Sequence, residues 1–180
     1  MTKNLIAILL AAALSGCIPP QRQMSREQYL QTTQKHYSGV DAEKVLQLAE
    51  QMFTLSDGND YSFSYTDSGL RASRFYNVYL VFGISQGNFV WDVDTVRENG
   101  GVLVKIQVED RSGGLGNPTM SRFYNTPATY DLFWRRLDYL LGKSDHWPTC
   151  SEASALYQNN ETLWGDISPW CYVTADKRPD

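Results

Sequence analysis

Alternation of polar and apolar residues recurs between Tyr61 and Glu109, and this period of two most strongly limits what the chain folds into. It is typical of β-strands with one buried face. Residues 70–84 predict a longer, largely buried strand or two short ones, and Asn99-Gly100 favours a tight hairpin turn. Each of the two strands that flank this turn has one apolar face. In the strand before the turn this face is Phe89, Trp91, Val93 and Thr95, and in the strand after it the face is Val102, Val104, Ile106 and Val108. The pattern predicts an antiparallel sheet with one solvated side.

Two amphipathic helices flank this stretch. Asp41 is a suitable N-cap for a helix over 41–55, and Thr126-Pro127 starts a second helix that Gly142 ends. Their apolar stripes are Val45, Leu48, Ala49, Met52 and Phe53, and Tyr130, Phe133, Trp134, Leu137 and Leu141. We therefore expect an α+β fold in which a meander of four or five antiparallel strands packs on both helices. It resembles a helix-grip two-layer sandwich, a likeness of architecture that implies no activity.

The first 16 residues are typical of a secretory signal peptide, with Lys3 ahead of an apolar core that is too short to span a bilayer. The ending Leu14-Ser15-Gly16-Cys17 resembles the lipobox of bacterial lipoprotein precursors, whose cysteine is acylated and becomes the mature N-terminus. The resemblance implies lipid attachment at Cys17 and durable membrane anchoring. The alternative is an ordinary signal peptide with a chance cysteine.

The residue after the acylated cysteine helps to decide to which membrane such a lipoprotein is sorted. It is Ile18, whereas an aspartate there tends to retain Gram-negative lipoproteins at the inner membrane. The resemblance thus implies the periplasmic face of the outer membrane, or the plasma membrane if the host is Gram-positive. Residues 17–40 begin with Cys-Ile-Pro-Pro and are rich in glutamine, so we predict a lipidated tether followed by one domain over 41–180.

The charge balance argues against polyanionic partners. The formal net charge is −4, and loss of residues 1–16 removes one base, Lys3, and no acid. An acidic chain has no electrostatic reason to bind nucleic acid or anionic lipid headgroups. Membrane binding is therefore expected through the lipid on Cys17.

Two cysteines remain besides Cys17. Cys150 and Cys171 form an even pair in an exported chain, which predicts a disulfide that staples the C-terminal segment. The alternative is metal or thiol chemistry that uses His146 and Cys150. A tetrahedral zinc site needs about four ligands, and only Cys171 and the distant His36 are left to complete one. We therefore predict no metal site and no cofactor.

Three motifs invite a catalytic interpretation. Residues 83–87 match the G-x-S-x-G pattern of a nucleophile elbow around Ser85. That motif needs a helix after the serine, whereas residues 88–96 are strand-like. A hairpin turn between two strands explains both glycines without catalysis. Asp92 and Asp94 share one strand face, which favours a solvated surface over a cation site or an acid–base pair. The glycines of 113–116 lack the Lys-Ser/Thr of a phosphate loop. His36 is expected to be exposed in the tether, and His146 to be structural. No catalytic residue is predicted.

Aromatic residues are unusually frequent. They serve a binding interface, a ligand pocket or an aromatic core. The set is Tyr61, Tyr65, Tyr76, Tyr79, Tyr124, Tyr130, Trp134, Trp147, Trp164 and Trp170. The function we expect is a non-enzymatic accessory module that binds a protein partner in a cell-envelope or secretion assembly. The alternatives are a carrier of small hydrophobic ligands and a hydrolase built on Ser85 or the carboxylates.

Overall fold

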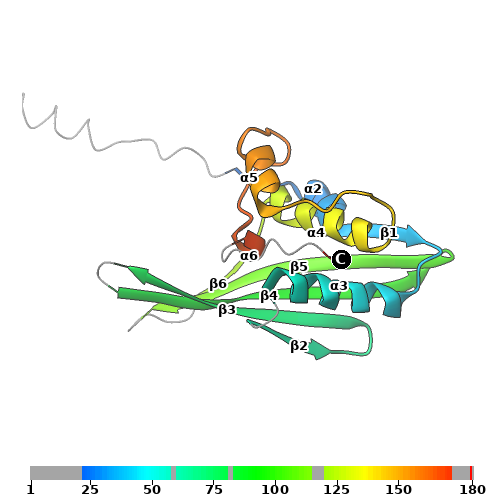
Figure 1. Ribbon diagram of the computed structural model, residues 1–180, viewed down its shortest axis with the longest axis horizontal. Coiled ribbons are helices and arrows are strands. Elements are labelled where there is room, and N and C mark those ends of the chain that lie inside the picture. Colours follow the sequence, from blue (N-terminus) through cyan, green and yellow to red (C-terminus); the bar gives the residue numbers. More distant parts are fainter. Residues whose placement is uncertain (1–21, 58–59, 81–82, 115–119, 172–178, 180) are drawn as a thin grey trace, which may run out of the picture.

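The computed structural model describes residues 22–57, 60–80, 83–114, 120–171 and 179. The fold is α+β, as predicted, with one antiparallel sheet and helices against one of its faces (Figure 1). The helices are α2 (Arg26–Thr33), α3 (Ala42–Asp57), α4 (Pro127–Leu140), α5 (Cys150–Gln158) and α6 (Ser168–Cys171). The six strands are β1 (Gln34–Ser38), β2 (Tyr61–Tyr65), β3 (Gly69–Leu80), β4 (Gly83–Glu98), β5 (Gly101–Gly114) and β6 (Met120–Phe123). None of the described helices is both long and apolar enough to cross a bilayer.

The sheet is built around the long hairpin of β4 and β5. Its turn is the predicted one, with positive φ angles of 48° at Asn99 and 71° at Gly100. The strand order is β1-β5-β4-β3-β2, and β6 also pairs with β5. Because β4 occupies one edge of β5, β1 and β6 share the other edge, β1 along residues 101–105 and β6 along residues 109–112. At one end of the sheet the two edge strands are therefore β1 and β2, and at the other end they are β6 and β3.

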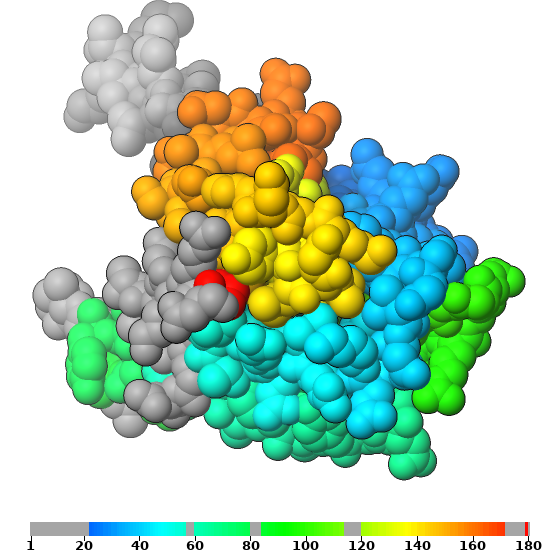
Figure 2. Space-filling model, turned by 45° about the vertical axis from the view of Figure 1, so that its right-hand side comes forward, coloured from blue at the N-terminus to red at the C-terminus, as the bar shows by residue number. Residues whose placement is uncertain are grey.

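An aromatic cluster fills the space between the sheet and the helices. The ring centroids of Trp91 and Trp170 are 4.4 Å apart, and Phe53 stacks on Trp170 at 5.2 Å. Phe133 of α4 lies 5.9 Å from Trp91. In the space-filling view, α3 (cyan) and the residues at the end of α4 (yellow) form a continuous surface over this layer (Figure 2).

The predicted disulfide between Cys150 and Cys171 is present, with the two Cα atoms 5.7 Å apart. It fixes the position of Trp170, which is buried and donates a hydrogen bond from Nε1 to the Thr129 carbonyl at 3.0 Å. The buried guanidinium of Arg136 lies 5.6 Å from the Trp170 ring and 4.9 Å from the Trp147 ring. The C-terminal segment thus completes the core.

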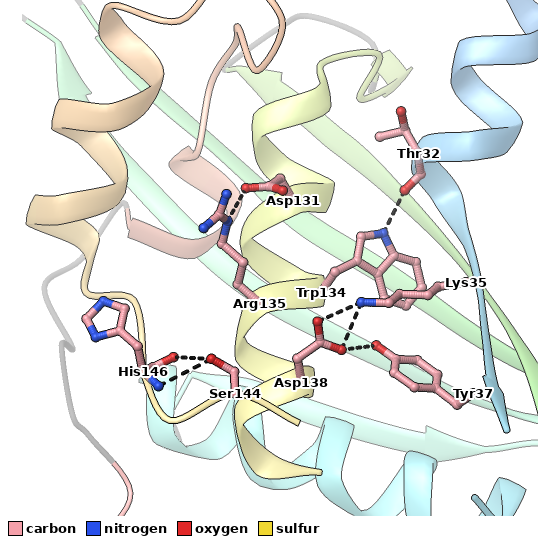
Figure 3. A network of polar contacts seen from close by, with 9 residues as sticks. All are labelled: Thr32, Lys35, Tyr37, Asp131, Trp134, Arg135, Asp138, Ser144 and His146. Carbon is pink, nitrogen blue, oxygen red and sulfur yellow. Dashed lines mark hydrogen bonds and ion pairs between the residues drawn. The ribbon is translucent and has the colours of Figure 1, made fainter. Parts of the chain in front are cut away.

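The prediction of a tether up to residue 40 was wrong at its C-terminal end. Lys35 and Tyr37 of β1 contact Asp138 of α4, through an ion pair of 2.6 Å and a hydroxyl hydrogen bond of 2.8 Å (Figure 3). Trp134 donates from Nε1 to the Thr32 carbonyl at 2.7 Å. Burial and the nearby carboxylate raise the pKa of Tyr37, which keeps its hydroxyl protonated as a donor. These contacts are remote in sequence, so the local glutamine-rich pattern did not reveal them.

The long strands extend past the helices that cover them. The 16 residues of β4 span about 53 Å in an extended strand, whereas the 16 residues of α3 span about 24 Å in a helix. We call the projecting end of the sheet the β-arm, made of residues 75–80, 83–90, 109–114 and 120–123; its base, at Phe89 and Val90, is still buried. Figure 1 shows it projecting to the left of the helix layer.

The disulfide is expected to contribute about 3 kcal/mol to the free energy of unfolding, because it closes a long loop. Replacing Cys150 and Cys171 together by serine is expected to lower the urea midpoint accordingly. Reduction of the wild-type protein should give the same loss, and the reduced double variant serves as the control that no longer responds. An unchanged midpoint in both cases contradicts this assignment.

Asp138 is expected to matter more for stability than its ion-pair partner. Asp138→Ala leaves the buried Tyr37 hydroxyl without its acceptor, which costs about 1–3 kcal/mol. Lys35→Ala removes a partly exposed pair, worth about 0–1 kcal/mol. Urea unfolding of the two variants measures the difference, and equal losses would contradict the role given to Tyr37.

Candidate interaction surface

Among the described residues, one edge of the β-arm has no neighbouring strand. β2 pairs with β3 only along residues 70–74. Of the described strands, none accompanies the other side of β3 from Phe75 to Leu80, while β4 pairs with it on the inner side throughout. An edge of this kind presents a row of backbone donors and acceptors to another chain.

The direction of these backbone groups follows from the β2–β3 turn. Gly69 accepts a hydrogen bond from the Thr66 N–H at 2.9 Å, on the β2 side, and Ser68 accepts one from the Thr95 N–H at 2.8 Å, on the β4 side. Along an antiparallel strand, the backbone N–H and C=O groups of successive residues point alternately to one side of the strand and to the other. The N–H and C=O groups of Phe75, Asn77 and Tyr79 therefore point outward from the open edge.

The same residues expose apolar surface. Phe75 is 52% exposed and Tyr79 is 78% exposed, and both lie on the face of the sheet that the helices leave uncovered. Ile84, the cross-strand partner of Tyr79, is also exposed. The run from Phe75 to Trp91 contains no charged residue and no proline. Natural edge strands usually carry such residues to prevent pairing, so this edge is unprotected.

The inner face of the β-arm is rigidly packed at its base. Tyr76 donates a hydrogen bond to Asp110 at 2.8 Å and stacks on Phe89 with ring centroids 4.6 Å apart. Gly87 lies opposite Tyr76 in the ladder. A Cβ atom at Gly87 would lie 2.6 Å from the Arg111 carbonyl oxygen and 2.7 Å from the Tyr76 hydroxyl, so only glycine fits there. The arm is thus held as a firm extension of the sheet.

Ser85 lies within β4, two residues before Gly87. The strand continues to Glu98, so the serine is not followed by the helix that a nucleophile elbow needs. This agrees with the sequence-based rejection of the elbow. β3 and β4 do form a hairpin, but the prediction that its turn contains Gly83 and Gly87 was wrong, because both glycines belong to β4. Likewise, Gly113 and Gly114 lie in β5 instead of a loop, and residues 115–119 lie outside the described residues.

The two aspartates lie on the solvated face, as predicted. Asp92 accepts two hydrogen bonds from Arg71, from Nε at 2.6 Å and from Nη2 at 2.9 Å. These bonds raise the pKa of Arg71. Asp94 is exposed. Asp92 therefore acts as the partner of an arginine across two strands, which is a structural role.

Neither histidine belongs to the β-arm. His36 is exposed, as predicted, but it lies in β1, where its Nε2 is 3.2 Å from the Glu98 carbonyl oxygen. His146 is exposed, and its backbone N–H donates a hydrogen bond to the Ser144 hydroxyl (Figure 3). Its Nε2 lies 3.4 Å from a Glu152 carboxylate oxygen. Within the described residues, no three His, Cys, Asp or Glu side chains are grouped so that they could hold a metal ion. Cys17 lies outside the described residues.

Most of the frequent aromatic residues belong to the core. The buried members are Tyr61, Tyr124, Tyr130, Trp134, Trp147 and Trp170. Tyr76 and Trp164 are half-buried, and Tyr65 and Tyr79 are exposed. Sequence reasoning missed Phe75, although the uncharged run that begins with it was a usable signal.

A surface cleft of about 610 Å³ lies apart from the β-arm, between α3 and the β2–β3 turn. Its lining includes Glu43, Leu46, Tyr65, Asp67 and Arg97. Partial burial and a hydrogen bond to Glu50 raise the pKa of Tyr65 to about 12. Charged side chains of both signs lie among the apolar ones in this lining. The cleft therefore differs from the predominantly apolar sites that hold hydrophobic ligands.

Comparison with known protein families and with curated proteins gives no match for this chain. The interpretation of its surfaces therefore depends on their geometry and chemistry.

The fit of Gly87 under Tyr76 yields a test of the arm's rigidity. Gly87→Ala is expected to cost about 1–3 kcal/mol through overpacking and to speed amide hydrogen exchange in residues 75–90. Ser85→Ala, on the same strand and face, adds no atoms and serves as the control. Equal exchange in both variants would contradict the proposed close packing.

Proposed function

We propose that this protein is a lipid-anchored lipoprotein of the bacterial cell envelope, on the periplasmic face of the outer membrane in a Gram-negative host, and that it is a non-enzymatic binding module there. The lipobox-like ending at Cys17 supports the anchor. The Cys150–Cys171 disulfide agrees with an oxidising compartment outside the cytoplasm.

The open edge of β3 is the observation that carries the binding function. Outward backbone groups at Phe75, Asn77 and Tyr79 provide hydrogen bonds for an added strand, and the two exposed aromatic side chains provide apolar contact beside it. Binding by strand addition combines these two contributions. The partner that fits is an extended, uncharged protein segment with apolar side chains at every second residue.

The alternatives receive less support from the described residues. A carrier of hydrophobic ligands needs room between sheet and helices, and that space is occupied by Phe53, Trp91, Phe133 and Trp170. A hydrolase built on Ser85 needs the elbow geometry, and Ser85 lies in a continuous strand.

Substitution of Asn77 tests strand addition. Asn77→Pro removes an outward N–H without interrupting the pairing to β4, since edge strands tolerate proline there. Asn77→Ala removes the same side chain and keeps the N–H. Native mass spectrometry of full-length protein, gently extracted from its own membrane, is expected to show a protein complex for wild type and Asn77→Ala, and none for Asn77→Pro.

Three results would contradict this proposal. A complex that persists in Asn77→Pro would place the partner elsewhere, and a bare monomer in the wild type would remove the binding function. A wild-type monomer with a bound small molecule would favour the carrier.

A further inference from the structure

The chain between the predicted lipid and the folded domain is very short. The described structure starts at Arg22, only five residues after Cys17. Five fully extended residues reach at most about 17 Å. A small domain is about 30 Å across, so an acylated Cys17 would hold one particular side of this domain against the membrane. This step rests on the proposed lipid anchor.

Arg22 lies at the base of the β-arm, on the side of β6. Its guanidinium is 5.0 Å from the centre of the Trp164 ring and donates a hydrogen bond to the Glu161 carbonyl. Arg22, Arg122, Phe123 and Trp164 line one cavity of about 490 Å³. The strand that carries Phe123 is therefore the part of the β-arm nearest to the lipid.

β6 exposes two large apolar side chains at this place. Met120 is 71% exposed and Phe123 is 52% exposed. They are three residues apart, so they project from opposite faces of the sheet at this edge. We call this pair the β6 patch. Aromatic and other apolar side chains favour the boundary between headgroups and acyl chains. β6 is also a sheet edge with backbone groups to satisfy, so the headgroup level suits it and the hydrocarbon core does not.

Charge contributes little to this surface. Arg122 lies 4.0 Å from Asp110, and Asp166 lines the same cavity as Arg22. The two bases are thus offset by two acids, and the whole chain is acidic. The contact must be apolar in origin and insensitive to salt.

We propose that the β6 edge lies edge-on in the interface of the membrane that holds the lipid anchor, with the β6 patch, Met120 and Phe123, entering it from the two faces of the strand. The bilayer then contacts the β6 edge of the β-arm. The other edge, β3, is three strand spacings away, about 14 Å, and stays available for a protein partner.

Two phenylalanines provide a matched test. Phe75 and Phe123 are equally exposed and lie on opposite edges of the β-arm. Each is replaced in turn by the photoreactive p-benzoylphenylalanine in full-length, acylated protein, reconstituted in vesicles of phosphatidylethanolamine and phosphatidylglycerol. Mass spectrometry then measures the yield of lipid adducts. We expect a yield several-fold higher at position 123 than at position 75, unchanged by added salt.

The experiment distinguishes a failure of the β6 membrane contact from a failure of the lipid anchor. Equal yields at both positions, no adduct at 123, or a yield that falls with salt would overturn the membrane contact of the β6 patch while the anchor stands. Absence of the acyl mass on Cys17, or failure of the protein to float with vesicles, would overturn the anchor and this inference with it.

Discussion

A strand rises about twice as far per residue as a helix, and this difference in length shapes the molecule. β3, β4 and β5 have 12 to 16 residues, while the two main helices have 14 and 16. Helices of that length cannot cover such strands. The covered half becomes a core closed by Trp170 and the disulfide, and the uncovered half becomes the β-arm. Both proposed contacts of this protein lie on that uncovered half.

The covered half holds together through contacts that are distant in sequence. Arg136 of α4 donates from Nη1 to the Ser56 hydroxyl of α3 at 3.1 Å and from Nε to the Pro148 carbonyl at 3.2 Å, between the rings of Trp147 and Trp170. Asp138, two residues further along α4, holds β1 through Lys35 and Tyr37. Helix α4 therefore connects the N-terminal and C-terminal segments to the sheet, which gives the β-arm a fixed base.

Local patterns predicted the elements whose information is local. The turn at Asn99-Gly100, the inward faces of β4 and β5, helices α3 and α4 and the cysteine pair were predictable from period, turn residues or cysteine count. Helices α5 and α6 were not predicted, because their segment has little periodic pattern. β1 was missed because its place depends on Asp138, and the strand position of Gly87 was missed because it depends on Tyr76. The open edge was not predictable either, since the point where β2 stops pairing is a property of the sheet. The uncharged run that forms this edge was visible in the sequence.

The proposed function requires that a partner strand occupies the open edge of β3 when the protein is anchored in its membrane. Amide hydrogen exchange at Phe75, Asn77 and Tyr79 shows whether this edge is occupied, when it is measured for full-length protein in its own membrane and again after purification. We expect slow exchange at these three amides in the membrane and fast exchange in the purified protein, while the amides of α4 stay equally protected in both. Equally fast exchange at all three amides in both samples would contradict it.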